Sequence, residues 1–432
     1  MKKTDTHPSI YRLAQQTTPL IYLASCAFIM ILIMRTWLVM GLITPVTVSG
    51  SSMAPTLVGP HIEMACSKCQ QTLRLAAQQL PSANLIHCPY CQQGRLDWTH
   101  AVSQPGTRLW IDRTLTGWRL PHRWEVVVFY SPWQNYTFHS SKQGSRKTAV
   151  LCTKRVLGLP GEQLQLVAGD LWIDGQLQVK KLTEQHLLRQ LIRCNPSPLT
   201  LPEDQKDSEK ESLFLTDQSY TDDAPYNGQL SRKLNLIQDF MLSTHLTCQG
   251  KGSLTWTIDD GRQPLTIRIQ PAVGTMQLLD HGRPLLMQTL SESSRQRLAH
   301  GEVLLELSTF DRQLLLAIDG QVELQYPLQL GVLPAGTRDP FVVTVTNLTV
   351  TLREAALWRD VYYGARPVGV GSWGTTFTRK NISPKHQTAC WQLASDELFL
   401  VGDNAPVSID SRVWPQAGMP RHLLVGRVIE SR

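Results

Sequence analysis

Short runs in which apolar and polar residues alternate are the feature that most limits how this chain can fold. Leu254, Trp256 and Ile258 alternate with polar residues, and an Asp-Gly turn sequence follows at residues 260–261. Alternate side chains of a strand share one face, so such runs are typical of half-buried strands joined by tight turns. The pattern predicts a mainly β fold in which residues 190–357 form a two-sheet β-sandwich. Further runs of this kind begin at Leu265, Val303, Val322 and Phe341.

The N-terminal region has the pattern of a single membrane span. Residues 1–18 are polar and carry basic side chains, and residues 19–41 are apolar except for a few positions such as Arg35. About 20 helical residues cross a bilayer, so we expect a transmembrane helix over residues 19–41. Basic residues favour the cytoplasmic side, which predicts a cytoplasmic N-terminus and an extracytoplasmic remainder. A cleaved secretory signal is the alternative, although no clear Ala-x-Ala site follows the apolar run.

Four of the nine cysteines form two Cys-x-x-Cys pairs. Cys66 and Cys69 make the first pair, Cys88 and Cys91 make the second, and 18 residues lie between the pairs. Thiolates from two such turns can complete a tetrahedral metal site, so residues 61–99 are predicted to form a zinc ribbon that binds structural zinc. Two disulfides in an oxidising compartment are the alternative. The five remaining cysteines are scattered, and their odd number indicates no disulfide framework.

Three stretches carry the residues best suited to cleaving a peptide bond, and none of them contains histidine. Ser52 follows the apolar segment and precedes Met53-Ala54-Pro55, Lys154 lies within residues 152–162, and Ser408 lies within residues 400–412. A serine needs a base to take its proton. A lysine, with an ordinary pKa of about 10.4, serves as that base only where burial lowers its pKa. The simpler interpretation of Lys154 is an ordinary surface lysine.

In their order along the chain and in their residues, these stretches resemble the conserved sequences of type I signal peptidases, also called leader peptidases. These are membrane serine proteases that use a Ser-Lys dyad. The resemblance implies that Ser52 is the nucleophile, Lys154 the general base and Ser408 the residue that orients the lysine. It assigns the oxyanion to the Ser52 backbone N–H, with Ser51 as a further donor. Structural support falls to Arg155, Asp410 and Arg412, of which the last two could also be a plain surface ion pair.

The resemblance also divides the chain. It implies a signal-peptidase-type β catalytic domain in three parts, over residues 42–60, 100–189 and 358–432, interrupted by the ribbon and by the sandwich with its charged linker. Residues 310–320 resemble concanavalin- or laminin-G-type sandwiches, which predicts a glycan or protein ligand for this insertion. Many family members carry a serine two places before the nucleophile, and this chain has Gly50 there.

The implied function is that of a membrane-bound signal peptidase I in the bacterial inner membrane. It would cleave signal peptides from exported preproteins through an acyl-enzyme, in contact with membrane lipid and with no cofactor for catalysis. A net charge of +7 without a long basic block argues against a nucleic-acid partner. A self-cleaving repressor of the related Ser-Lys type would begin with a DNA-binding helix pair instead of an apolar span. The other alternative is a non-catalytic, membrane-anchored scaffold that binds glycan or protein on a signal-peptidase frame.

Overall fold

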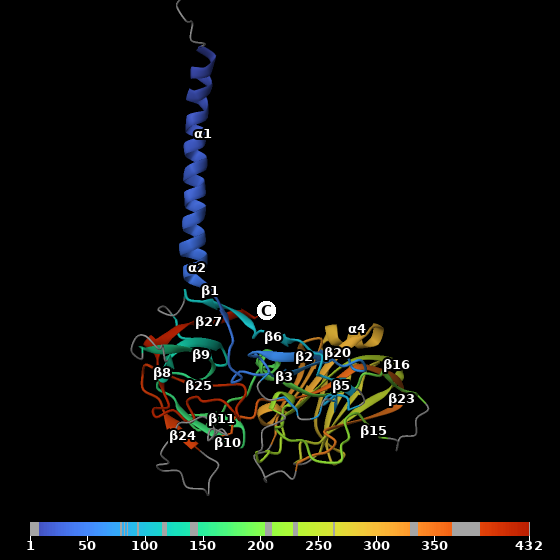
Figure 1. Ribbon diagram of the computed structural model, residues 1–432. Helices are drawn as coiled ribbons and strands as arrows, with labels where there is room; N and C mark the ends of the chain where they lie inside the picture. The colour runs from blue at the N-terminus through green and yellow to red at the C-terminus, as the bar shows by residue number, and fades with distance from the viewer. Residues whose placement is uncertain are drawn as a thin grey trace, which may run out of the picture.

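The computed structural model describes the chain in twelve segments, and within them the protein is mainly β, as the alternating runs predict. Figure 1 shows a long helix above a body of packed sheets. The described segments are residues 8–77, 80–81, 83, 85–92, 95–114, 119–138, 146–203, 210–227, 232–261, 264–328, 336–364 and 389–431.

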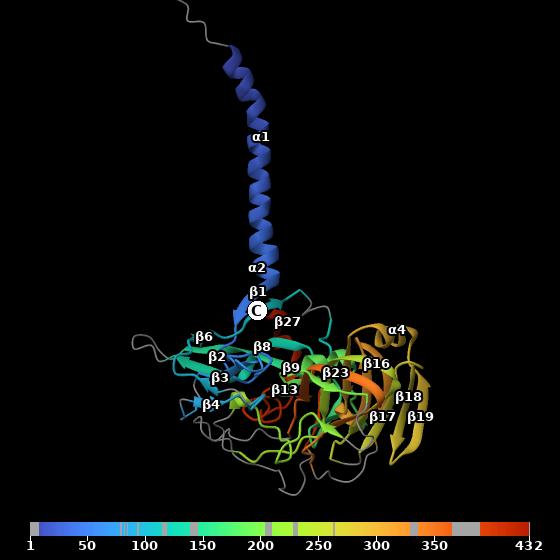
Figure 2. The same cartoon turned by 90° about the vertical axis from the view of Figure 1, so that its right-hand side faces the viewer.

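The N-terminal helix projects away from the body in both views (Figures 1 and 2). Helix α1 (Pro8–Ile33) continues through the π-helical segment η1 (Met34–Val39) into the short α2 (Met40–Leu42). The large apolar side chains between Ile21 and Met34 are exposed. Among the described residues, no helix combines the length and the hydropathy that crossing a membrane requires. The transmembrane helix predicted over residues 19–41 therefore gains no support from this criterion.

The three predicted catalytic parts meet in one seven-stranded sheet with the order β1-β7-β27-β8-β9-β25-β26. Strands β8 and β9 form a hairpin in which Val127 lies opposite Lys154, and β25 pairs with the other edge of β9 from Arg155 onward. A second sheet, β12-β11-β10-β24, packs against it through buried residues such as Leu157, Leu164 and Phe399. Burial of each such side chain stabilises the fold by about 1.5–3 kcal/mol. The strands are β1 (Ile43–Thr47), β7 (Arg108–Asp112), β8 (Val126–Phe138), β9 (Arg146–Gly158), β10 (Gln163–Val167), β11 (Asp170–Ile173), β12 (Gln176–Leu177), β24 (Ala389–Gln392), β25 (Glu397–Val401), β26 (Met419–Pro420) and β27 (Leu424–Ser431).

The described residues between 61 and 99 form small hairpins around the two Cys-x-x-Cys turns. Gln70 and Gln92 follow the two pairs, and both adopt the left-handed backbone conformation. Each donates its backbone N–H to the first cysteine of its pair, so the two turns are built alike. Their strands are β2 (His61–Ala65), β3 (Thr72–Ala76), β4 (Leu85–His87) and β5 (Arg95–Asp97), and β2 also pairs with β6 (Ser103–Gln104).

The insertion is built on two strands of 19 residues each, β16 and β23, which pair along their whole length. The first half of β16 pairs with β20, which is followed across the sheet by β21 and β22. The second half pairs with β17, which is followed by β18 and β19. Buried side chains of both wings, such as Ile267 and Leu316, belong to one hydrophobic core. The predicted sandwich is therefore one continuous sheet that folds over on itself, and Figure 2 shows the wing formed by β17, β18 and β19. The elements are β13 (Gln190–Cys194), β14 (Leu199–Leu201), β15 (Glu211–Ser212), β16 (Phe240–Ile258), β17 (Leu265–Gln270), β18 (Thr275–Asp280), β19 (Arg283–Thr289), α4 (Glu292–His300), β20 (Val303–Ser308), β21 (Gln313–Ile318), β22 (Gln321–Pro327) and β23 (Phe341–Arg359), with the 3-10 turns η2 (Pro225–Asn227) and η3 (Phe310–Arg312).

Gly252 allows an irregularity in the middle of the long strands β16 and β23. The register of β16 against β23 shifts between Gly250 and Ser253. A Cβ atom on Gly252 would lie 1.7 Å from the carbonyl oxygen of Thr346, so only glycine fits at this approach of two backbones. The two wings can therefore leave the same edge of β16 in different directions.

The two ends of the insertion lie side by side where it joins the catalytic parts. Gln190, the first residue of β13, pairs with Arg359, the last residue of β23. Helix α3 (Leu182–Leu188) precedes this junction. The buried ammonium of Lys180 lies between the carboxylates of Asp311 and Asp360, with the latter at 2.8 Å. The insertion is thus attached to the catalytic parts by a buried charge network as well as by the chain itself.

Candidate active site

The loop after β1 presents Ser52 at the surface of a cavity. Met53 and Leu57 are buried together with Leu109 of β7, and the Leu57 N–H donates to the Met53 carbonyl at 2.9 Å. These apolar anchors hold the loop in place, and Ser52 lines a cavity of about 220 Å³. The Ser52 N–H donates to no acceptor among the described residues. The turn therefore leaves both the hydroxyl and the N–H of one serine available.

Lys154 reaches this serine from the facing strand β9. Its Nζ donates a hydrogen bond to Ser52 Oγ at 2.6 Å, although 102 residues separate the two positions. The lysine is only 5% exposed. Burial lowers its pKa, and this effect outweighs the opposing influence of Cys152 and Asp410. A lysine held in this way has an increased neutral fraction, which is the form that can accept a proton.

Asp410 and Arg412 form a fully buried ion pair behind the serine. The guanidinium donates to both carboxylate oxygens at 2.8 Å, and the Gly402 N–H donates to the same carboxylate at 3.0 Å. Burial raises the pKa of Asp410, but Arg412 and the hydrogen bonds outweigh it, so the pKa lies below its usual value. Arg412 also donates to the carbonyls of Ala405 and Gly364, at 2.8 and 3.0 Å. The pair therefore fixes the loop that follows β25.

Arg155, the third residue assigned to structural support, forms a second buried ion pair, with Asp403. Its Nε donates to an Asp403 carboxylate oxygen at 2.7 Å, a further bond joins Nη2 to the other oxygen, and Nη1 donates to the Trp124 carbonyl at 2.6 Å. Asp403 raises the pKa of Arg155 against the effect of burial. Asp403 lies in the third sequence stretch, and the need of a buried arginine for a carboxylate was the signal that could have identified it.

Ser408 lies close to the backbone of Ser52 but is not hydrogen-bonded to Lys154. It is fully buried, and its Oγ makes no well-formed hydrogen bond within the described residues. A Cβ atom on Gly402 would lie 2.3 Å from both Ser408 Oγ and the Ser52 carbonyl oxygen. Glycine at position 402 therefore allows these two serines to approach each other. The predicted orienting role of Ser408 remains a prediction.

Asn404 is a site residue that the sequence analysis missed. Its backbone N–H donates to the Ser52 carbonyl at 3.0 Å, and its side-chain amide donates to the Ser51 carbonyl at 2.9 Å. Its own carbonyl accepts from the Ser408 N–H at 3.1 Å. The residue therefore connects the backbones of all three serines.

The four paired cysteines come together in a cluster that can hold a metal ion. Their sulfur atoms all lie within 4.8 Å of one another. The Sγ atoms of Cys66 and Cys91 are 3.7 Å apart, and those of Cys69 and Cys88 are 3.8 Å apart. A tetrahedral Zn²⁺ with Zn–S bonds of about 2.3 Å separates its ligands by about 3.8 Å, so the donor set fits zinc. None of the four is in a disulfide, which argues against the alternative of two disulfides.

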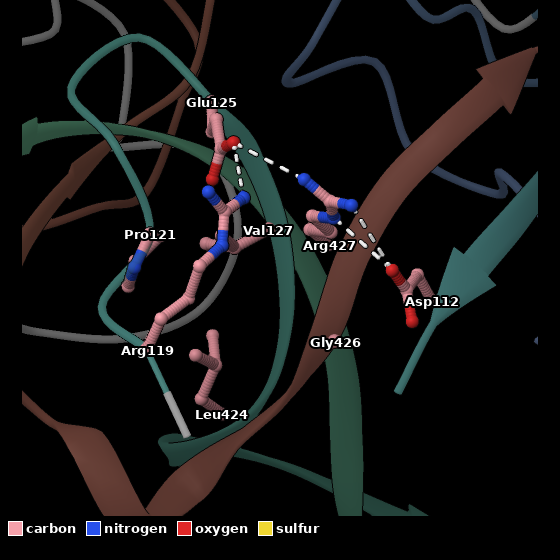
Figure 3. Close-up of a pocket in the computed structure, with 8 residues that line it drawn as sticks. All are labelled: Asp112, Arg119, Pro121, Glu125, Val127, Leu424, Gly426 and Arg427. Carbon is pink, nitrogen blue, oxygen red and sulfur yellow. Dashed lines mark hydrogen bonds and ion pairs between the residues drawn. The ribbon is translucent and has the colours of Figure 1, made fainter. Parts of the chain in front are cut away.

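A separate hollow between β7, β8 and β27 is lined by charged side chains that form ion pairs with one another (Figure 3). Glu125 accepts from Arg119 at 2.9 Å and lies 3.5 Å from Arg427, which pairs with Asp112 at 3.2 Å. The cavity measures only about 20 Å³, and none of the predicted site residues lines it. The candidate active site is therefore the cavity beside Ser52 and Lys154.

Comparison with protein families supports the resemblance to signal peptidases over the first half of the chain. Residues 20–230 match the family described as "Signal peptidase, peptidase S26", a family of serine peptidases. The match includes Ser52 and Lys154 and ends before Ser408. No curated protein matches the chain.

Solved structures with similarity to the chain include a carbohydrate-binding module and two galectins. They are a carbohydrate-binding module from Bacillus subtilis (9% identity, 28% of this chain and 74% of that one, TM-score 0.20), sheep galectin-11 in complex with glycerol (11%, 36% and 99%, 0.22), and a tetrameric galectin from the ball sponge Cinachyrella (12%, 29% and 96%, 0.23).

Proposed function

We propose that the chain is a serine endopeptidase of the signal peptidase I type that works through Ser52 and Lys154. The observation that carries this proposal is the 2.6 Å hydrogen bond between the buried Lys154 Nζ and Ser52 Oγ. In the first step, the neutral lysine takes the serine proton while Oγ attacks the scissile carbonyl. The resulting ammonium then protonates the leaving amine, and an acyl-enzyme ester remains. In the second step, Lys154 deprotonates a water molecule that hydrolyses this ester.

The negative charge that develops on the carbonyl oxygen needs donors. The Ser52 N–H has no acceptor among the described residues, and Ser51 is the adjacent candidate for a second donor. Because Gly50 replaces the serine that many relatives carry, more of this stabilisation depends on the backbone N–H. Loss of one oxyanion donor typically costs 10²–10³-fold in rate in other serine proteases.

An extended preprotein segment is the substrate that this cavity fits best. Strand β1 is an edge strand of the sheet, and residues 150–154 of β9 lie beyond its pairing with β25. Residues of both strands line the cavity with Ser52. A peptide in β conformation can add to such edges by main-chain hydrogen bonds. Val407 and Ile409 add apolar walls, which favour uncharged side chains.

The test is cleavage of a preprotein by the full-length chain purified in detergent, with the product defined by mass spectrometry. We expect one cut after a small residue at the end of the signal peptide, and no product with Ser52→Ala. Equal amounts of product from wild type and Ser52→Ala, or none from either, would contradict the proposal.

We further propose that the chain acts at the bacterial inner membrane, with its N-terminus cytoplasmic and its catalytic parts extracytoplasmic. The exposed apolar side chains of α1, such as Phe28 and Ile33, support contact with membrane lipid. Flotation of the full chain with lipid vesicles, compared with Phe28→Asp/Ile33→Asp, tests this contact. Equal flotation of both proteins would contradict it.

The cysteine cluster is proposed to bind one structural zinc ion, held by Cys66, Cys69, Cys88 and Cys91. A site with four thiolate ligands has no open position, so the ion would stabilise the ribbon and take no part in cleavage. A glycan or protein ligand of the sandwich stays a prediction, and binding of a glycan array by the full chain would test it.

A further inference from the structure

The amide of Asn404 is held by a residue of the insertion. Asn227 Nδ2 donates to Asn404 Oδ1 at 2.6 Å, and Asn404 Nδ2 donates to Asn227 Oδ1 at 3.0 Å. The two side chains thus form a reciprocal amide pair, and both residues are buried, at 4% and 3% exposure. They are 177 residues apart in the chain.

This pair constrains the plane in which the Asn404 amide lies. An amide group has two N–H donors on one end and an acceptor on the other. With Asn227 in place, one Nδ2 hydrogen goes to Asn227 Oδ1 and the other goes to the Ser51 carbonyl. A flipped Asn404 amide would place its oxygen against the Ser51 carbonyl, and Asn227 would have to flip with it to keep the pair. Without Asn227, the Asn404 amide loses two of the three side-chain hydrogen bonds that hold it, and only the bond to the Ser51 carbonyl remains.

The segment that carries Asn227 is itself firmly attached. Tyr226 packs against Ala54 and Val58, directly after the nucleophile. Five residues before Asn227, Asp222 accepts two hydrogen bonds from Arg232 at 2.8 Å, and its carbonyl accepts one from Arg359 at 3.2 Å. The insertion therefore supports the serine loop through an apolar contact and a polar contact.

We infer that Asn227 is a positioning residue for Ser52, so that the inserted domain is part of the active-site structure. This inference rests on the proposed peptidase function. Asn227 acts through Asn404, whose bonds to the Ser51 and Ser52 carbonyls fix the peptide units on which the hydroxyl and the oxyanion N–H are mounted. Small displacements of such groups lower rates strongly, by up to about 10²-fold for 1 Å.

The test uses full-length variants and two readouts, preprotein cleavage and the reaction of Ser52 with a fluorophosphonate probe. Asn227→Ala removes the partner, and Asn227→Asp keeps the size but sets an acceptor against Asn404 Oδ1. Both should lower kcat about 10- to 100-fold, change KM by less than about twofold, and slow the probe reaction by the same factor. Asn195→Ala, a matched change elsewhere in the insertion, should leave both readouts unchanged. Asn404→Ala combined with Asn227→Ala should be no slower than Asn404→Ala alone.

The rate constant of probe labelling separates positioning from folding. A purely structural role would lower the labelled fraction at the end point while the rate constant per active molecule stays at the wild-type value, and this result would overturn the inference. Wild-type kcat in both Asn227 variants would also overturn it and leave the proposed function intact. Absence of any Ser52-dependent cleavage or labelling in the wild type would overturn both.

Discussion

Lys154 Nζ and Ser52 Oγ lie 2.6 Å apart, the lysine in a strand interior and the serine in a turn. The strand fixes the lysine because β8 pairs with it on one side, and β25 pairs with the strand from the next residue. The turn fixes the serine because its flanking apolar residues are buried. Neither residue can therefore move away from the other without disturbing packed elements.

Removal of either partner should abolish cleavage. Ser52→Ala eliminates the proposed nucleophile and Lys154→Ala the proposed base, so each should lower kcat at least about 10³-fold, and the double variant should be no worse than either single one. Lys154→Arg should be equally inactive because a guanidinium stays protonated. Single-turnover cleavage measures these rates, with the exposed Lys251→Ala as control. Substantial activity in Lys154→Arg would show that Lys154 is not the base.

Activity should rise with pH in the way a buried lysine titrates. The base works only when neutral, and burial lowers the pKa of Lys154 below that of an ordinary lysine. The profile of kcat/KM should therefore increase through a pKa below 10.5 and then level off. Stopped assays across this range measure it, and a profile without an ascending limb would contradict the assignment.

The same burial should reduce stability at low pH. The folded state binds its proton at Lys154 less tightly than the unfolded state, so the unfolded chain carries more protons between the lowered pKa and 10.5. The contribution of Lys154 to the free energy of unfolding therefore increases with pH in that window. Below the window, the buried lysine is charged and its desolvation lowers stability by the full amount. Lys154→Met should be more stable than wild type at neutral pH, and the difference should shrink as the pH approaches 10.5. Denaturant unfolding at several pH values tests this expectation, which a constant difference would contradict.

Loss of one cysteine of the cluster should release the metal. Cys66→Ser leaves three thiolates, and we expect the content of about one zinc ion per chain to fall and the ribbon to lose protection from proteolysis. Cys390→Ser changes an exposed cysteine outside the cluster and serves as the control. Metal analysis together with limited proteolysis measures both effects. Wild-type protein that carries no metal would contradict the prediction.

The parts of the site that a sequence can reveal are those where the residue type itself is chemically demanding. Ser52, Lys154 and the four cysteines could be identified in advance as candidates, because a serine and a lysine in characteristic stretches and two Cys-x-x-Cys pairs are recognisable patterns. Asn227 could not, because an asparagine in a turn-like segment has many ordinary uses and its role appears only when Asn404 lies beside it. Alternation shows which face of a strand is buried and not which strands pair. It therefore predicted a sandwich but not the two strands of 19 residues that join its wings.

The last prediction concerns the second buried ion pair, which the sequence analysis did not identify. The side chains of Arg155 and Asp403 are 3% and 0% exposed, so the charge of one is compensated mainly by the other. Asp403→Asn would leave a buried guanidinium without its carboxylate, at a cost of about 3–5 kcal/mol in the free energy of unfolding. Asp112→Asn is the matched control, because its partner Arg427 is 32% exposed and can turn to water, so it should cost at most about 1 kcal/mol. Chemical denaturation of both variants compares the two costs. Equal values would mean that the Arg155–Asp403 pair is dispensable, and that the loop carrying Asn404 is held mainly by Asp410 and Arg412.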